Sequence, residues 1–467
     1  MADYLDGELI NVPIGNPVIV DSLSTDSRHI QANQLFWALK GERFDAHDFV
    51  VNLASNDPHI PHKAAAALVH RPIDCALPQI VVSDTYQALA TLARRWREQF
   101  NKPVIALTGS NGKTTLKEML AAILSQQGQV MATAGNFNNE IGMPLTLLRL
   151  RDADDYAVIE MGANHFGEIA YLTDIAQPDV AIVNNAGAAH LEGFGSIKGV
   201  SRAKGEIFQG LSSNKTHKTQ KGIAIINADD QYADYWRSIN TEHEIITFGM
   251  DHPADVHGEL QADGSLQIML PKQQTVVVQL PLLGQHNALN ALAASAAAIA
   301  VNASLASIKQ GLESLQAVKG RLAPIKGQNN STLIDDTYNA NPSSIEKAID
   351  VLAARQGRRV LVLGDVAEIG DNGEQLHREI GEYAAQAHID VLYGFGEAIQ
   401  ATCEAFQQAG KESHFFSEMP LLLKALQIEI QPNTTLLAKG SRSMKMERVI
   451  AAFENKSASA NKEEGAC

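Results

Sequence analysis

Hydrophobic residues follow two spacings along most of this chain. Compact apolar runs such as Pro103–Thr108, Tyr156–Met161 and Asp179–Val183 have the length of buried strands. In the segment that follows the first run, apolar side chains recur at helical spacing and share one face: Leu116, Met119, Leu120, Ile123 and Leu124. Strands that alternate with amphipathic helices predict an α/β fold, in which helices cover both faces of a parallel sheet.

The alternation recurs in three regions, and we expect three α/β domains, at residues 1–101, 102–319 and 320–454. In the first region, Ile80–Ser83 is typical of a strand and Tyr86–Phe100 of a helix.

The central region continues with a further predicted strand, Ile223–Asn227. From residues 255 to 283 the pattern changes to that of β-hairpins, with Gly264 in an Asp-Gly turn. An alanine-rich helix, Asn287–Val301, is expected to close the region.

The last region has strand-like runs that alternate with helices. The predicted strands are Leu333–Ile334, Arg359–Leu363, Val391–Tyr393 and Thr435–Ala438. The predicted helices are Ser344–Ala354, Glu374–Ala387 and Ala398–Gln408. This order predicts a second doubly wound unit, Rossmann-like in character. Residues 455–467 are polar and low in complexity, and we expect a disordered tail there.

Composition narrows the class of protein. Hydrophobic residues make up 45% of the chain and charged residues 19%, as in globular proteins with substantial cores. The formal net charge of −15 argues against non-specific nucleic-acid binding, although a local site can still attract an anion. No run approaches the ~20 apolar residues of a membrane span. The N-terminus, with Asp3, Asp6 and Glu8, does not resemble a signal peptide. Three scattered cysteines favour a reducing, cytoplasmic location.

A phosphate-binding loop is the sharpest local signal. It lies between a predicted strand and a predicted helix and reads Thr108-Gly109-Ser110-Asn111-Gly112-Lys113-Thr114-Thr115. Glycines let backbone N–H groups turn toward phosphate oxygens, and the helix N-terminus adds its positive dipole end. Lys113 would reach the outer phosphates, and a threonine hydroxyl would face magnesium. Gly109 stands two residues closer to Gly-Lys than in the common P-loop, so a glycine-rich helix cap is the alternative.

Three further residues are candidates for a metal site. Glu160 ends a predicted strand, where α/β sheets place ligands, and carboxylate oxygens suit Mg²⁺. His190 follows another strand, but a lone loop histidine is more often no ligand at all. Lys204 lies on a predicted helix and, taken alone, is an ordinary solvated cation.

Asparagine-rich segments suggest where a ligand binds. Asn287 and Asn290 lie three apart at the start of the alanine-rich helix, so they share a face and can hydrogen-bond an adenine edge. Helix capping is an equally good explanation of this pair. The segments 335–344, 363–370 and 439–445 each follow a strand with dense polar or charged side chains, which favours ligand loops over plain turns.

Together these motifs resemble the Mur ligase family over nearly the whole chain. Asp26-Ser27-Arg28, Gly41 and Asp45-Ala46-His47 resemble its UDP-sugar module. The phosphate loop, the run Gly135–Gly142, Glu160, the run Ala189–Glu192 and Lys204 resemble its central ATPase module. The segments 336–342 and 363–370 resemble the member that adds a dipeptide. Val366, Ala367 and Ala46 depart from the family's usual residues, conservatively.

The resemblance implies an activity. It implies ATP-dependent joining of D-alanyl-D-alanine to UDP-N-acetylmuramoyl-tripeptide through an acyl phosphate, with Mg²⁺ as cofactor and Lys204 carbamylated by carbon dioxide. Lys113, Glu160, His190 and Lys204 would be catalytic, and the last three, with Thr114, would surround the metal. We also expect a monomer that binds no nucleic acid.

The resemblance likewise implies binding roles. Nucleotide contacts would come from the phosphate loop and from Asn287, Asn290, Arg321 and Asp336. Substrate contacts would come from Ser27, Arg28, Asn136, Asn138, Asn139, Tyr338, Asn339 and Asn341.

Three alternatives remain at this stage. One is a sister ligase that adds a single amino acid, or a folylpolyglutamate-type ligase. Another is a P-loop ATPase or GTPase switch. The last is a nucleotide-sugar binding protein with a decayed ATPase, against which the intact Lys113, Thr114, Glu160 and Lys204 argue.

Overall fold

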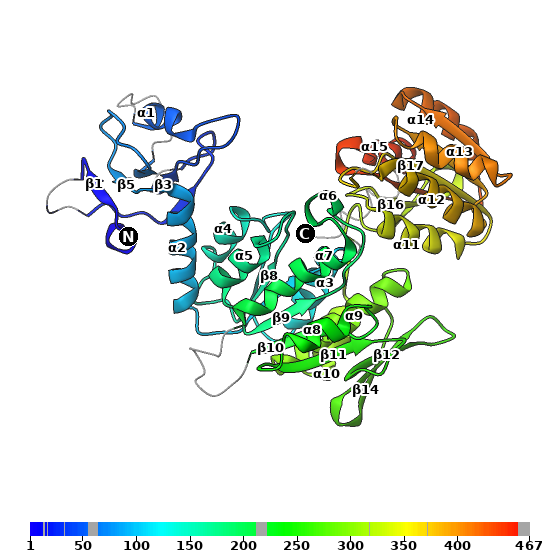
Figure 1. Cartoon of the computed structure of the whole chain (residues 1–467), viewed down its shortest axis with the longest axis horizontal. Helices are drawn as coiled ribbons and strands as arrows, with labels where there is room; N and C mark the ends of the chain where they lie inside the picture. Colours follow the sequence, from blue (N-terminus) through cyan, green and yellow to red (C-terminus); the bar gives the residue numbers. More distant parts are fainter. Residues whose placement is uncertain are drawn as a thin grey trace. The chain divides into compact units, whose positions relative to one another are not determined.

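The computed structural model describes residues 1–12, 15, 17–31, 33–54, 64–211, 222–316, 318–370 and 372–455. In this part of the chain the strands form three sheets, of five, nine and six strands (Figure 1). The predicted α/β class is confirmed. The chain divides into two compact units, of which the first joins Met1–Asn101 to Ala134–Arg151 and the second holds Lys102–Thr133 and the chain from Asp152 onward. The three domain bounds remain predictions, and the predicted tail, apart from Asn455, lies outside the described residues.

The first unit is built on the five-stranded sheet, ordered β1-β5-β4-β3-β2. Its strands are β1 (Glu8–Ile10), β2 (Ser22–Ser24), β3 (Gln34–Trp37), β4 (Ala66–Val69) and β5 (Gln79–Val81). Its helices are α1 (Val50–Leu53), α2 (Thr85–Gln99) and α4 (Gly142–Leu147). Alternate residues of β3 enter two separate cores, because successive side chains of a strand point to opposite faces. Ile141, Leu145 and Leu148 pack against the core that contains α2, so the segment 134–151 completes this unit.

The nine-stranded sheet begins the second unit, with the order β14-β13-β12-β11-β10-β9-β6-β8-β7. Its parallel strands are β6 (Val104–Thr108), β7 (Val130–Ala132), β8 (Tyr156–Glu160), β9 (Val180–Val183), β10 (Ile223–Asn227) and β11 (Glu244–Gly249). The predicted hairpins are present as β12 (Val256–Leu260), β13 (Leu266–Leu270) and β14 (Gln274–Val278). Gly264 has φ +82° in the turn between β12 and β13, a conformation that glycine adopts without strain.

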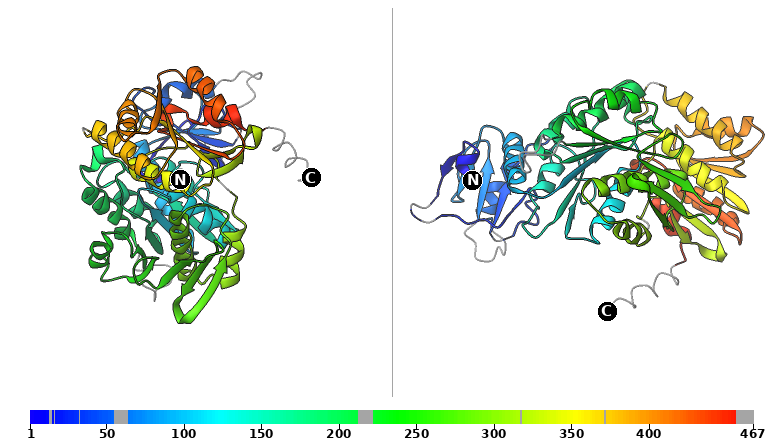
Figure 2. Two further views of the ribbon diagram at one scale, coloured as in Figure 1. Left: turned by 90° about the vertical axis from the view of Figure 1, so that its right-hand side faces the viewer. Right: turned by 90° about the horizontal axis from the view of Figure 1, so that it is seen from below.

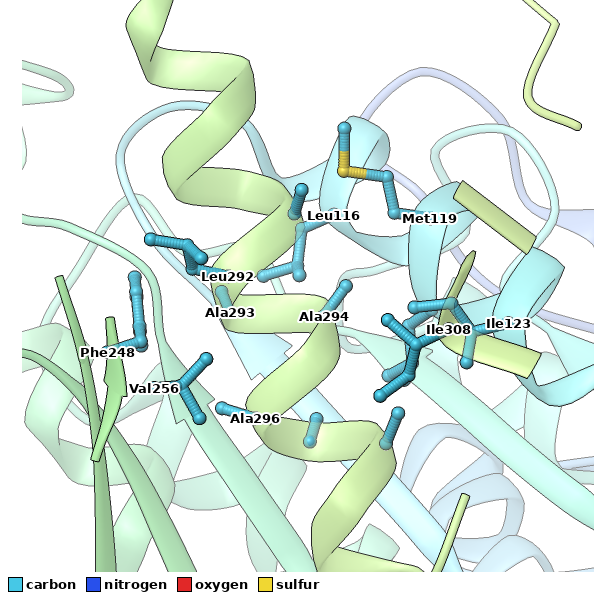
Figure 3. Packing of buried hydrophobic residues seen from close by; sticks show 14 of the residues in the cluster. Leu116, Met119, Ile123, Phe248, Val256, Leu292, Ala293, Ala294, Ala296 and Ile308 are labelled. Carbon is cyan, nitrogen blue, oxygen red and sulfur yellow. The ribbon is translucent and has the colours of Figure 1, made fainter. Parts of the chain in front are cut away.

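Seven helices accompany this sheet among the described residues. They are α3 (Lys113–Leu124), α5 (Glu168–Ala176), α6 (Leu191–Phe194), α7 (Ile197–Gly205), α8 (Ala233–Ser238), α9 (Gln285–Ala300) and α10 (Leu305–Glu313). In Figure 3, Leu116, Met119 and Ile123 of α3 lie beside the alanines of α9 in one buried cluster. The small alanine side chains let α9 pack closely into this core, which α3 also enters. Truncating a fully buried leucine such as Leu116 to alanine would cost about 2–5 kcal/mol.

The six-stranded sheet has the order β15-β16-β20-β17-β18-β19, and all its strands except β15 are parallel. They are β15 (Ala323–Lys326), β16 (Thr332–Asp336), β17 (Arg358–Gly364), β18 (Val391–Phe395), β19 (Glu412–Phe416) and β20 (Thr434–Lys439).

Helices cover both faces of this sheet. Leu361 and Leu363 of β17 pack with α11 (Pro342–Ala353), α12 (Gly373–Gln386) and α13 (Gln400–Gln408). Val360 and Val362 pack with α14 (Met419–Leu426) and α15 (Glu447–Phe453) on the opposite face. The elements can be followed in two further views in Figure 2. The doubly wound prediction is therefore confirmed. Across the described residues, no helix has the length and apolarity to span a membrane.

Candidate active site

The phosphate loop connects β6 to α3, as the sequence predicts. Gly112 has φ +77°, and a Cβ atom there would lie 2.5 Å from the Asn290 side-chain oxygen and 2.9 Å from the Asn184 side-chain nitrogen. Both the backbone conformation and the crowding therefore require glycine at this position. The Lys113 Nζ donates to the carbonyl oxygen of Gly109 at 2.7 Å. Desolvation lowers the pKa of Lys113, and the nearby Glu160 opposes that shift.

Thr114 is the meeting point of two further predicted residues. Its hydroxyl donates to Glu160 Oε2 at 3.1 Å and accepts from Arg321 Nη2 at 3.0 Å. Glu160, at the end of β8, is 3% exposed, and its backbone N–H donates to the Thr133 hydroxyl at 2.9 Å. The strand end therefore holds a carboxylate beside the phosphate loop, a position from which it can bind a hydrated magnesium ion.

Lys204 is fully buried on α7. Its Nζ has no hydrogen-bond partner among the residues that the structure describes. Burial lowers the pKa of Lys204 to about 7, and the charge of Lys113 contributes in the same direction. The Phe194 ring lies 5.6 Å from the Nζ. The predicted helix is confirmed. The expectation that Lys204, taken alone, is a solvated cation is wrong, because its side chain is buried.

His190 precedes α6, in a left-handed backbone conformation with φ +53°. Its Nδ1 lies 2.9 Å from Glu368 Oε2. Burial lowers the pKa of His190, the charges of Lys113 and Lys204 lower it further, and Glu368 opposes them.

The predicted asparagine pair lies in a chain of amide hydrogen bonds. Asn184 donates to Asn290 at 2.8 Å, Asn290 to Asn287 at 3.2 Å, and Asn287 to the carbonyl oxygen of Leu283 at 2.6 Å. A cavity of about 840 Å³ is lined by Asn184 and Asn290 of this chain and by Asn111, whereas Asn287 lies behind Asn290 and does not line it. The volume falls within the range of small-molecule sites.

The loop after β16 contacts the phosphate loop. Asn111 donates to the Ser343 hydroxyl at 2.7 Å and accepts from Asn341 at 2.8 Å. This contact brings the predicted substrate residue Asn341 to the site.

The neighbouring predicted residues are held differently. Asp336 forms an ion pair with Lys439 at 2.7 Å, and Lys439 also donates to the carbonyl oxygen of Asn339 at 2.8 Å. The guanidinium of Arg321 lies 4.1 Å from the centre of the Tyr338 ring.

The remaining predicted substrate residues belong to the first compact unit. They are Ser27, Arg28, Asn136, Asn138 and Asn139. Arg28 is bound by both oxygens of Asp26, at 2.9 and 2.8 Å, and Asn139 accepts from the backbone N–H of Gly142 at 2.9 Å.

Sequence reasoning overlooked several site residues. Asn184 and Asn185 follow β9 directly, and Asn185 accepts from the backbone N–H of Asn111 at 2.9 Å. Their position after a predicted strand was a usable signal. Glu368 lies in a segment noted for its carboxylates, but nothing in the sequence linked it to His190.

Comparisons with known proteins agree with this geometry. The chain matches the Mur ligase middle domain over residues 107–298 and the Mur ligase, glutamate ligase domain over residues 320–442. It is 45% identical over 461 residues to the UDP-N-acetylmuramoyl-tripeptide–D-alanyl-D-alanine ligase of Escherichia coli, covering 97% of each chain. A crystal structure of MurF from Acinetobacter baumannii is similar with TM-score 0.86 and 39% identity, covering 96% of each chain. The MurF ligase of Thermotoga maritima in complex with ADP is similar with TM-score 0.80 and 27% identity, covering 94% of this chain and 98% of that one.

Proposed function

The chain belongs to the Mur ligase family, and from that premise we propose that it joins D-alanyl-D-alanine to UDP-N-acetylmuramoyl-tripeptide, using ATP. The observation that carries the proposal is a phosphate loop with Lys113 beside Glu160, together with a buried Lys204 that lacks a hydrogen-bond partner among the described residues. The name of the Escherichia coli relative, similar over 97% of both chains, supports the choice of substrates.

We assign the nucleotide to the cavity beside the phosphate loop. The residues Thr108 to Thr115 would hold the phosphates. Asn287 and Asn290 would lie at the adenine ring. Arg321 and Asp336 would approach the nucleotide from the six-stranded sheet. Ser27 and Arg28 would help to hold the UDP end of the UDP-linked substrate. The other predicted substrate contacts are Asn136, Asn138, Asn139, Tyr338, Asn339 and Asn341.

A magnesium site fits the residues present. The described residues contain no cluster of three or more His, Cys, Asp or Glu that would hold a metal alone. Mg²⁺ does not need one, because it keeps several waters and shares phosphate oxygens with its substrate. Thr114, Glu160 and His190 would supply protein ligands, and a bound ion would neutralise charge on the transferring phosphoryl group.

Carbamylation of Lys204 fits its environment. A neutral amine is the form that adds to carbon dioxide, and burial with a pKa of about 7 makes that form available near neutral pH. The resulting carbamate has two oxygens and a negative charge, which would suit a metal ligand and give the buried Nζ hydrogen-bonding atoms.

The reaction would proceed in two steps. The tripeptide carboxylate attacks the γ-phosphorus of ATP, a P–O bond breaks, and ADP leaves an acyl phosphate behind. Lys113 stabilises charge on the phosphoryl oxygens. The amine of D-alanyl-D-alanine then attacks the acyl carbon, loses a proton, and expels phosphate as the amide forms. Exclusion of water protects the acyl phosphate during this interval.

We also propose that the enzyme acts in the cytoplasm as a monomer. The scattered cysteines are consistent with a reducing compartment.

Phosphate release from ATP and Mg²⁺ tests the proposal under four conditions: no acceptor, the UDP-linked tripeptide alone, D-alanyl-D-alanine alone, and both. We expect sustained release only with both. Release without an acceptor would indicate an ATPase, and release with a single amino acid in place of the dipeptide would indicate a sister ligase.

Lys204→Ala tests the carbamate separately. We expect the loss of most activity, with partial recovery when a short carboxylic acid such as acetate is added. Unchanged activity in the variant would remove Lys204 from the mechanism while leaving the substrates in place.

A further inference from the structure

An ion pair joins the candidate active site to a loop of the six-stranded sheet. Glu368 lies between β17 and α12, and its Oε2 is 2.9 Å from His190 Nδ1. The two residues are far apart in sequence, and neither the phosphate loop nor the asparagine chain includes Glu368. Its side chain is 57% exposed, which is not the burial expected of a residue kept for packing.

The Glu368 loop is held on several sides. The Ala367 N–H donates to the Ser441 hydroxyl at 2.7 Å, and the Ser441 N–H donates to the carbonyl oxygen of Asp365 at 3.0 Å. The Asp365 carboxylate accepts from the backbone N–H groups of Glu397 and Ile399, at 3.0 and 2.8 Å. The backbone around Glu368 is therefore held by hydrogen bonds that do not involve its side chain.

Both partners of the pair have left-handed backbones. His190 has φ +53° and Glu368 has φ +61°. Histidine is one of the residues that enter this region more readily, whereas glutamate rarely does, and such conformations concentrate at functional sites. The left-handed backbone of Glu368 is thus part of the geometry that brings its carboxylate to His190.

We propose that Glu368 is a positioning residue whose carboxylate accepts a hydrogen bond from the Nδ1–H of His190 and so leaves the Nε2 lone pair free for a divalent cation. A neutral imidazole carries its proton on one nitrogen, and the hydrogen bond made there decides which nitrogen is free to bind metal. Histidines that bind metals commonly donate their other N–H to a carboxylate or carbonyl oxygen. This inference rests on the metal role proposed for His190 and adds to it the residue that fixes the ring.

The arrangement has a consequence for the proposed reaction. The ligand belongs to the segment after β9, whereas the residue that orients it belongs to the other sheet of the same unit. Metal affinity would therefore depend on the Glu368 loop being in place.

Mn²⁺ binding measured by electron paramagnetic resonance, on the full chain with ADP present, tests the inference without relying on turnover. We expect Glu368→Ala to weaken Mn²⁺ binding about 10-fold, in keeping with losses of a metal ligand's hydrogen-bond partner. Glu368→Gln, which keeps an acceptor oxygen, should lose less. Glu374→Ala is the matched control, because Glu374 follows in the same region and pairs with Arg378 instead.

His190→Ala distinguishes the metal-binding role of His190 from the positioning role of Glu368. If this variant binds Mn²⁺ as tightly as the unchanged chain, or the unchanged chain binds none, both the metal role and the inference are wrong. If His190→Ala weakens binding but Glu368→Ala stays within twofold of the unchanged chain, only the role of Glu368 is overturned.

Nuclear magnetic resonance of ¹⁵N-histidine-labelled protein provides the second readout. The His190 signals, assigned by their loss in His190→Ala, should report a proton on Nδ1 in the unchanged chain. We expect a mixture of tautomers in Glu368→Ala. A proton on Nε2 in the unchanged chain would contradict the proposal whatever the Mn²⁺ affinities.

Discussion

Two regions of the second unit bury charged side chains in opposite ways. At the carboxyl ends of the central strands, Lys204 is fully buried with no hydrogen-bond partner among the described residues. In the six-stranded sheet, Glu429 is 4% exposed and is fully partnered. Arg358 donates to it through Nε and Nη2, the latter at 2.7 Å, and the Tyr393 hydroxyl donates at 3.0 Å.

The pKa shifts express the same contrast. Burial lowers the pKa of Lys204 to about 7, which disfavours its charged form. Burial by itself raises the pKa of Glu429, but the hydrogen bonds from Arg358 and Tyr393 outweigh it, and the pKa is lowered. A buried charge with partners becomes destabilising when one partner is removed, whereas a buried amine without partners is a candidate for chemistry.

Lys113→Met should have the largest effect, a loss of catalytic activity at the candidate active site. Lys113 is assigned to the transferring phosphoryl group, so its loss should reduce kcat by about 10³-fold, the scale for removing one transition-state donor. Phosphate release with both acceptors measures this, and a melting temperature near that of the unchanged chain is expected alongside. A loss below 10-fold would contradict the assignment.

Arg358→Met should lower the stability of the fold rather than the activity. It leaves the Glu429 carboxylate buried with a single donor, Tyr393, and we expect the free energy of unfolding to fall by about 2 kcal/mol. Urea unfolding measures this, with ligase activity unchanged at low denaturant. The double variant Arg358→Met with Glu429→Gln should regain most of the loss, because the amide oxygen still accepts from Tyr393. Failure to regain it would show that packing by Arg358 matters more than its charge.

The smallest expected effect is the pH dependence of the stability that the Arg358–Glu429 pair provides. Since the pKa of Glu429 is lowered in the folded chain, its stabilisation is present above the unfolded value of about 4.3 and is lost as pH falls below it. The destabilisation caused by Arg358→Met should therefore be smaller at pH 4 than at pH 7. Equal destabilisation at both values would argue that Glu429 does not titrate differently in the folded chain.

Long periodic segments account for what the sequence predicted well. The phosphate loop, Glu160 at a strand end and the helix of Lys204 all follow from local pattern. The strands of the first unit are three or four residues long, too short for a period to be visible, and only the last of them was anticipated.

Contacts between distant segments were beyond such reasoning. Asn111 and Ser343 are 232 positions apart, and His190 meets Glu368 only because two sheets of one unit bring them together. The burial of Lys204 was also invisible, because a lysine on a helix is solvated in most proteins.

The insertion of residues 134–151 into the first unit has a consequence for biosynthesis. Asn101 leaves the ribosome before the segment carrying Ile141, Leu145 and Leu148 has been made, and these residues cover part of that unit's core. At ~5–20 residues per second, the nascent unit waits several seconds with this apolar surface open. The first unit therefore cannot complete its core when Asn101 emerges, and its open apolar surface would be a binding site for chaperones until the segment 134–151 has followed.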